Sequence, residues 1–146
     1  MEWKYEAMEK LKEYTAVKAA LVNIPEEISR LEMEARSIKS ATADGTPVKG
    51  GGSGRENRLL SNIVKRQELG EMLIRAKKAV EIVERGLDVL TEDERSLLDR
   101  LYIHPESGGR ERLMAERCLT DPSSLNKQIN KALRHFTKAL TGGMES

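Results

Sequence analysis

Hydrophobic residues recur at spacings of three and four over the first forty positions of the chain, which places them on one face of an α-helix. Pro25 interrupts the pattern and disfavours helical angles at the residue before it. We therefore expect a helix over residues 3–22 and a second helical stretch to about Lys39, separate or joined through a kink. The predicted seam comprises Tyr5, Met8, Leu11, Thr15, Ala19 and Val22, flanked by Trp3, Tyr14 and Leu21, and then Ile24, Ile28, Leu31, Ala35 and Ile38.

The segment over residues 41–54 is rich in glycine and has no hydrophobic periodicity, so we expect a flexible connection there. Beyond it, a sustained heptad spacing predicts a long helix from about Arg55 to Val89. Its predicted stripe comprises Leu59, Ile63, Arg66, Leu69, Leu73, Ala76, Val80, Val83, Leu87 and Leu90, with Leu60 and Val64 alongside. The simplest arrangement is an antiparallel hairpin in which this stripe and that of the preceding helix bury each other. The alternative is a seam between two chains.

A new helix is predicted to begin after Leu90. Thr91 can cap it, and Glu94 stands at the reciprocal position of a capping box. Leu97, Leu98, Leu101 and Tyr102 give this helix an apolar face, and it has to end near His104 and Pro105.

Two further helices are predicted before the C-terminal glycines. A short helix over residues 110–118 is followed by a turn at Leu119 and Thr120. Asp121 is a strong N-cap, with Pro122 at the first position of a helix that runs to about Leu140 and ends at Gly142. Its apolar face comprises Leu125, Ile129, Ala132, Leu133, Phe136 and Leu140.

These elements predict an all-α protein with two domains. Residues 1–89 form a long, coiled-coil-like helical hairpin with its connection at 41–54, and residues 90–146 form a compact helix-turn-helix domain. Charged residues make up 34% of the chain and aromatic residues 3%, a composition that suits slender helices better than a broad β core. We expect a cytoplasmic protein, because no run is apolar enough for a signal peptide or a membrane span and the single Cys118 cannot form an internal disulfide.

The distribution of charge carries the functional hypothesis. Residues 91–109 hold five acidic and two basic residues, whereas residues 110–146 hold seven basic and four acidic ones. Between Pro122 and Met144 there is no acidic residue. A short helix, a turn and a longer basic helix are typical of a helix-turn-helix, whose second helix enters the major groove of DNA.

The polar residues of the last predicted helix suit that role, since asparagine, lysine and serine can contact base edges and cations can contact phosphates. The predicted DNA-binding residues are Ser123, Ser124, Asn126, Lys127, Asn130, Lys131, Arg134 and Lys138, with secondary contacts from Arg110, Arg112, Lys49 and Arg55. The competing interpretation is an amphipathic helix whose basic face is only solvated.

Two stretches also resemble region four of bacterial sigma factors: Leu90-Thr91-Glu92-Asp93-Glu94-Arg95-Ser96-Leu97-Leu98-Asp99-Arg100-Leu101-Tyr102 and the Arg110–Phe136 unit. With Asp44–Gly52 and Ser61–Arg66 added, the whole chain resembles the small sigma-like regulators of phages and prophages of Gram-positive bacteria, the ArpU and RinA type. The resemblance implies control of phage transcription, typically activation of late genes.

The sequence gives little support for a nucleotide site, a metal site, a reactive thiol or a catalytic site. The run Lys49-Gly50-Gly51-Gly52-Ser53-Gly54-Arg55 lacks the ending of a phosphate-binding loop. His104 and His135 have no further metal ligand at a suitable spacing, so we expect no metal and no cofactor. We expect Cys118 to be a small core residue. No catalytic set can be assembled, so we expect no enzyme.

The leading hypothesis is a phage or prophage transcriptional regulator that binds double-stranded DNA, with a hairpin that forms a homodimer or contacts RNA polymerase. Two alternatives stay open. One is a DNA-packaging adaptor of the small-terminase kind, and the other is a helical protein-interaction module without DNA binding.

Overall fold

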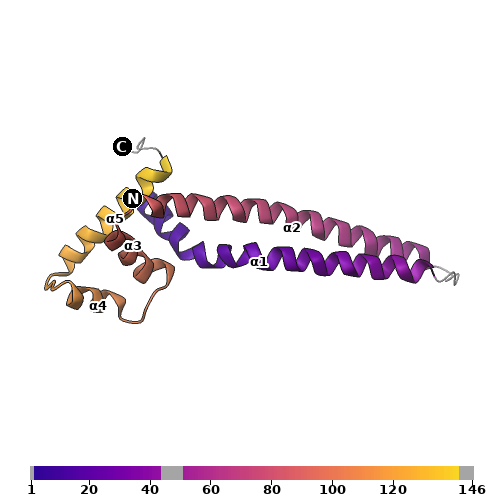
Figure 1. The fold of residues 1–146 in the computed structure, drawn as a ribbon, viewed down its shortest axis with the longest axis horizontal. Coiled ribbons are helices and arrows are strands. Elements are labelled where there is room, and N and C mark those ends of the chain that lie inside the picture. Colours follow the sequence, from indigo (N-terminus) through magenta and orange to yellow (C-terminus); the bar gives the residue numbers. More distant parts are fainter. Residues whose placement is uncertain (1, 44–50, 142–146) are drawn as a thin grey trace. The chain divides into compact units, whose positions relative to one another are not determined.

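The computed structural model describes residues 2–43 and 51–141, and every regular element in this part of the chain is a helix. Two long helices, α1 (Glu2–Ala43) and α2 (Gly51–Asp88), precede three shorter ones, α3 (Glu92–Leu98), α4 (Gly109–Glu116) and α5 (Pro122–Thr141). A π-helical turn, η1 (Asp99–Ile103), continues α3. The predicted all-α fold with a helical hairpin is confirmed (Figure 1).

Of the two expectations for Pro25, the structure has the joined helix, because α1 passes through this residue without a break. A proline inside a helix removes one backbone hydrogen bond and costs about 3 kcal/mol. Ile24, Leu31 and Ile38 on the same helix are all buried. Their burial, at about 1.5–3 kcal/mol for each fully buried side chain, is large enough to offset that cost.

The chain groups into two compact units, one of residues 1–18 with 78–146 and the other of residues 19–77. The second unit is a hairpin in which α1 and α2 run side by side (Figure 1). Ile24, Leu31, Ala35 and Ile38 of α1 are buried there, as their spacing predicts. The helices extend three and four residues into the predicted connection, and residues 44–50 lie outside the described part.

The seam of this hairpin contains a buried asparagine in place of a predicted isoleucine. Asn62 is 2% exposed, and its Nδ2 donates to the carbonyl oxygen of Leu31 at 2.8 Å. Its Oδ1 accepts from Nε of Arg66 at 2.8 Å, so both ends of the amide are satisfied. Ile63 is 42% exposed, so its predicted place in the seam is wrong. The spacing of three and four positions continues from Leu69 back through Arg66, Asn62 and Leu59, so the seam follows helical geometry even where the residue is polar.

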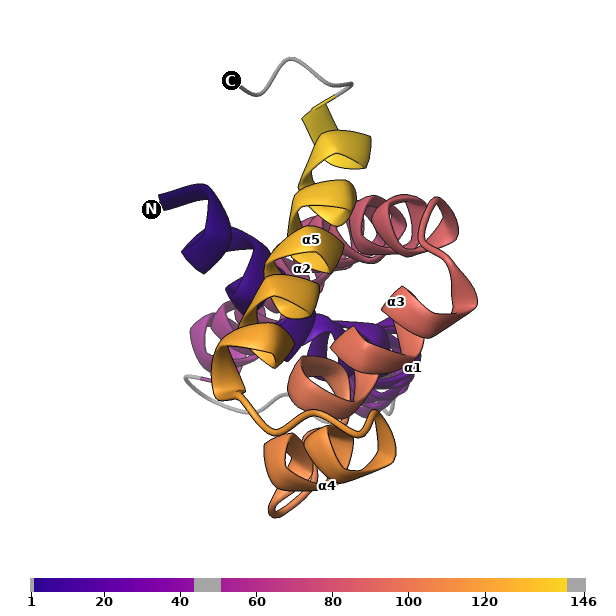
Figure 2. The same ribbon diagram turned by 90° about the vertical axis from the view of Figure 1, so that its left-hand side faces the viewer.

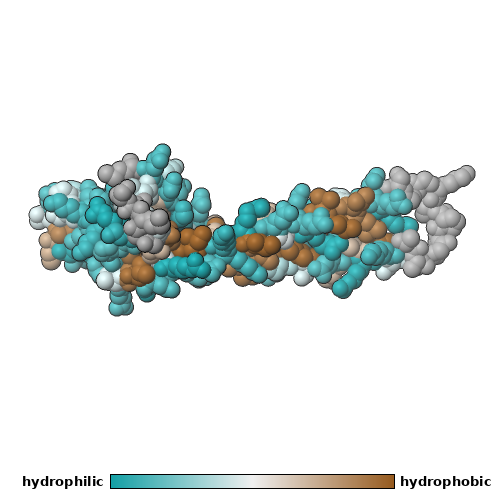
Figure 3. All heavy atoms as spheres, turned by 90° about the horizontal axis from the view of Figure 1, so that it is seen from above, coloured by the Kyte–Doolittle hydropathy of each residue, from teal (hydrophilic) through white to brown (hydrophobic). Residues whose placement is uncertain are grey.

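The opposite face of α2 carries hydrophobic side chains to the surface. Leu60 is 59% exposed and Val64 is 46% exposed, next to Ile63 on the same turn of the helix. Hydrophobic residues are visible on the surface of the hairpin in Figure 3. The apolar residues of this part of α2 are therefore divided between the seam and the solvent.

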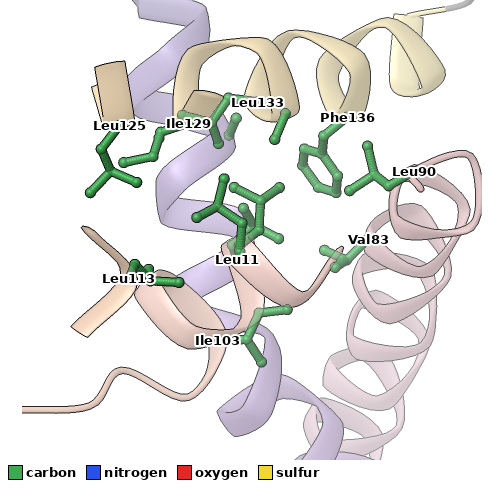
Figure 4. Packing of buried hydrophobic residues seen from close by; sticks show 13 residues of the cluster. Leu11, Val83, Leu90, Ile103, Leu113, Leu125, Ile129, Leu133 and Phe136 are labelled. Carbon is green, nitrogen blue, oxygen red and sulfur yellow. The ribbon is translucent and has the colours of Figure 1, made fainter. Parts of the chain in front are cut away.

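The first unit has a hydrophobic core to which every one of its helices contributes (Figure 4). Phe136, Leu133, Ile129 and Leu125 point from α5 into this core, toward Leu11 of α1. The other buried members are Ala7 of α1, Val83 of α2, Leu90, Leu97 and Leu98 of the α3 region, Ile103, Leu113 and Ala132. The predicted apolar face of the last helix is thus confirmed.

The stripe predicted for the start of α1 is partly wrong. Leu11 of this stripe is buried, as is Ala7, which lies outside it, and Trp3, Met8 and Tyr14 are partly buried against the core. Tyr5 is 64% exposed and Val22 is 61% exposed. The Tyr14 hydroxyl donates to Oε2 of Glu84 at 2.7 Å. Burial and this carboxylate raise the pKa of Tyr14 to about 12.

The start of α3 has the predicted capping box. Oγ1 of Thr91 accepts from the backbone N–H of Glu94, and Oε1 of Glu94 accepts from the backbone N–H of Thr91, both at 3.1 Å. Three acidic residues follow the cap in the first turn, where the helix dipole favours them. The N–H of His104 bonds to the carbonyl of Asp99 at 2.7 Å and ends the π-helical turn.

Candidate nucleic-acid interface

Helices α4 and α5 form the predicted unit of a short helix, a turn and a longer helix. α4 ends at Glu116 and α5 begins at Pro122, and α4 lies beside the N-terminal end of α5 (Figure 2). Leu113 of α4 is buried against the core that holds Leu125 of α5. This arrangement leaves the outer face of α5 open to solvent, as recognition by its side chains requires.

The turn between the two helices depends on Cys118. This residue has a φ of 57°, in the left-handed region that usually selects glycine. Its side chain is exposed, so the prediction that Cys118 is a core residue is wrong. Leu119 is half-buried and packs against the core instead.

Asp121 caps α5 as its position predicts. Its Oδ1 accepts from the backbone N–H of Ser123 at 3.0 Å, and its Oδ2 accepts from the Ser123 hydroxyl at 2.6 Å. The two hydrogen bonds hold the pKa of Asp121 below its usual value. The Ser123 hydroxyl already donates to this carboxylate, so it reaches a base edge only as an acceptor. Ser124 is half-buried and lies at the border of the exposed face.

Four cations line the outer face of α5. Lys127, Lys131, Arg134 and Lys138 are separated by four, three and four positions, and all four side chains are exposed. At 3.6 residues per turn, they share a stripe roughly 60° wide. The buried residues of α5 occupy the opposite side of the helix. The structure therefore places these four predicted residues together on one surface.

None of these four cations forms an ion pair within residues 2–43 and 51–141. The arginines around α4 are different. Arg100 contacts Glu106 at 2.6 Å and Glu116 at 2.5 Å. Its guanidinium holds the pKa of both carboxyls below the usual range. The cations of α5 thus have no carboxylate partner among the described residues and are available to an anionic ligand.

Lys131 stands at the acidic border of this stripe. It lines a hollow together with Asp93, Glu94, Arg117 and His135. Nδ1 of His135 lies 2.6 Å from Oε2 of Glu94. Burial raises the pKa of Glu94, but its hydrogen bonds with Thr91 and His135 outweigh that effect and lower it. We therefore expect Lys131 to contribute less to anion binding than the other three cations.

Two asparagines complete the predicted face, in different ways. Asn126 is exposed, and its Oδ1 accepts a hydrogen bond from Nη2 of Arg110. Asn130 is half-buried, and its Oδ1 is buried without a hydrogen-bond partner among the described residues. A bidentate contact from Asn130 to adenine would require its amide to turn outward.

The predicted secondary contacts are dispersed. Arg110 lies beside the N-terminal half of α5 through its bond to Asn126. Arg112 pairs with Glu106 at 3.2 Å. Arg55 is part of α2 in the other unit, and Lys49 lies outside the described residues.

Sequence reasoning missed the contacts that fix the turn and α5 on α3. Arg117 makes a bidentate ion pair with Asp93, at 2.8 and 3.1 Å, and donates to Oε1 of Gln128 at 2.8 Å. Bidentate geometry is specific as well as strong. The partners are 24 and 11 positions apart, and no spacing rule identifies such pairs.

Within the described ranges, no helix has the length and apolar content to cross a bilayer, and no group of acidic, histidine or cysteine side chains is placed to hold a metal ion. No family model matches the chain, and neither a curated protein nor a solved structure matches it.

Proposed function

We propose that this protein binds double-stranded DNA with α5 as its recognition helix, and that it regulates transcription of phage or prophage genes. The observation that carries the proposal is the stripe of four exposed cations on a helix without acidic residues, none of them ion-paired with a residue that the structure describes. A solvated surface helix usually mixes both signs of charge. A single-sign stripe opposite the core favours a polyanion as partner.

The dimensions of α5 fit the major groove. An α-helix with its side chains is about 10–12 Å wide, and the groove is about 12 Å wide. From Lys127 to Lys138 the stripe extends roughly 17 Å along the helix. The N-terminal residues of α5 would approach the base edges, while Arg134 and Lys138 would contact phosphates.

The choice of transcription over other DNA transactions rests on the sigma-like resemblance of residues 90–102 and 110–136. That resemblance also makes RNA polymerase the expected protein partner of the DNA-bound form. A monomer or dimer in light scattering would agree with a regulator of this kind. A ring of eight or more subunits in light scattering would instead favour a packaging adaptor.

The test is a triple variant, Lys127→Ala with Arg134→Ala and Lys138→Ala, measured on duplex DNA over a series of salt concentrations. Each phosphate contact contributes about 0.9 to the slope of log K against log salt. The variant is therefore expected to bind more weakly and to lose about 2.7 from that slope.

A matched control removes the same charge from another helix. Arg75, Lys77 and Lys78 of α2 are exposed and have no ion pair among the described residues, so their triple alanine variant should keep the wild-type slope. Equal losses in both variants would show that net charge, and not α5, governs binding. Absence of duplex binding by the wild type at low salt would refute the proposal.

A further inference from the structure

Arg110 and Asn126 are joined across α4 and α5 at the N-terminal half of the proposed recognition helix. Both side chains are exposed, and Nη2 of Arg110 donates to Oδ1 of Asn126. We infer that these two residues act as one base-reading pair that selects guanine over adenine. The inference rests on the proposed function, since it assumes that α5 enters the major groove.

The hydrogen bond determines which way the amide of Asn126 faces. Its oxygen is directed at the guanidinium, so its two N–H groups are directed away from Arg110. The neighbouring candidates are more restricted, because the Ser123 hydroxyl already donates to Asp121 and the Asn130 side chain is half-buried. Arg110 and Asn126 therefore present exposed N–H donors together at the N-terminal half of α5.

Arg110 differs from the other arginines near α4 in its partners. Arg100, Arg112 and Arg117 each pair with a carboxylate. Arg110 forms no ion pair with any residue the structure describes, and the side chain to which it is bonded is a neutral amide. Its charge therefore stays uncompensated at the place where a base edge would approach.

The chemistry of the pair favours one base. A guanidinium has five N–H donors, of which one is used on Asn126, and the amide adds two more. Guanine presents two acceptors in the major groove, N7 and O6, whereas adenine presents N7 and the donor N6 amino group. A cluster of donors with a positive charge thus matches guanine and opposes the adenine amino group.

The experiment selects bound sequences from a pool of duplexes with a randomised core. It uses the full-length protein, the Arg110→Ala and Asn126→Ala variants, the double variant that combines them, and Arg75→Ala. The wild type is expected to enrich a motif with guanine at one base pair. Arg110→Ala should reduce that preference by roughly tenfold and admit adenine there, because the freed amide then pairs with N6 and N7. Preferences at the other positions should stay as they are.

Asn126→Ala should weaken the same preference for guanine. The variant with both Arg110→Ala and Asn126→Ala should lose little more of this preference than either single variant, because the two residues act as a unit. Arg75→Ala removes an exposed arginine of α2; it is the matched control and should keep the wild-type motif. Circular dichroism and thermal melting of each variant establish that the fold is intact.

Three results would overturn the inference. One is an unchanged motif in Arg110→Ala. Another is a uniform loss of affinity across all sequences with a salt slope lower by about 1, which would make Arg110 a phosphate contact. The third is salt-dependent binding without any enriched motif. In each of these the proposed DNA binding stands, whereas failure of the wild type to bind any duplex would reject both proposals.

Discussion

Gly86 lies where α2 meets α5, and its replacement by alanine is a direct test of the packing in the first unit. A Cβ atom at this position would stand 2.4 Å from Cε1 and 2.5 Å from Cδ1 of Phe136, and 3.2 Å from Cδ2 of Leu140. Ordinary carbon–carbon contact is about 3.5–4.0 Å, so the overlap is about 1 Å. Phe136 is 0% exposed, so its ring is enclosed by the core and cannot turn out into solvent without opening it.

The expected cost follows from two opposing effects. Overpacking a filled core costs about 1–3 kcal/mol, and a rigid, buried ring belongs in the upper half of that range. Replacing glycine by alanine inside a helix stabilises the folded state by about 1 kcal/mol through helix propensity. Gly86→Ala should therefore lower the free energy of unfolding by about 1–2 kcal/mol.

Gly70 of α2 provides the matched control. A Cβ atom there would have no atom within 4 Å, so Gly70→Ala gains helix propensity without a clash. It should raise the stability of its own part of the helix by about 0.5–1 kcal/mol. Urea unfolding measures both variants, with circular dichroism reporting on all helices and the fluorescence of Trp3, the single tryptophan, reporting on the first unit.

A second variant isolates the contact itself. In a Phe136→Leu background the ring is absent, so adding Gly86→Ala should cost clearly less than it does in the wild type. The reasoning is refuted if Gly86→Ala is as stable as the wild type, or if its cost is the same in both backgrounds.

Two further predictions concern Cys118 and Glu94. Cys118→Gly should raise the free energy of unfolding by about 0.5–1 kcal/mol, because it removes the cost of about 1–2 kcal/mol for a left-handed residue with a Cβ, while the greater entropy of glycine in the unfolded chain offsets part of this gain. Cys118→Ser should leave stability unchanged. A destabilised glycine variant in urea unfolding would contradict this account. The pKa of Glu94 is lower in the folded state than its ordinary value of 4.5, so its contribution to stability should be complete above pH 4.5 and lost as the pH falls through the folded-state pKa. Glu94→Gln keeps an amide at the capping position and should flatten the loss of stability between pH 6 and 3 in urea titrations; an equally steep loss would assign it to other carboxylates.

The helices could be predicted from the sequence because their signals are local. Hydrophobic spacing identified α2 and α5, and the capping residues Thr91 and Asp121 placed the starts of α3 and α5 correctly. Such signals act within one or two turns, so they survive without knowledge of any partner. The basic stripe of α5 is equally visible in the sequence, since a spacing of four and three fixes a common face.

The seam residues were harder to predict because an apolar residue does not show which partner will bury it. Ile63 and Tyr5 matched the spacing of a stripe, yet they face solvent, while Asn62 and Ala7 are buried. The register that includes Asn62 becomes evident only when α1 supplies the carbonyl of Leu31. Likewise, the cost of Pro25 within α1 is offset only by packing that α2 provides.

What the sequence alone determined, therefore, is the helical class, the caps and the charge of α5. The tertiary structure decided which faces are buried, which cations stay unpaired and which side chains meet over long separations, such as Arg110 with Asn126 and His135 with Glu94. Local propensity and charge are properties of neighbouring residues, whereas these contacts depend on the mutual placement of helices, which hydrophobic burial sets and no single segment encodes.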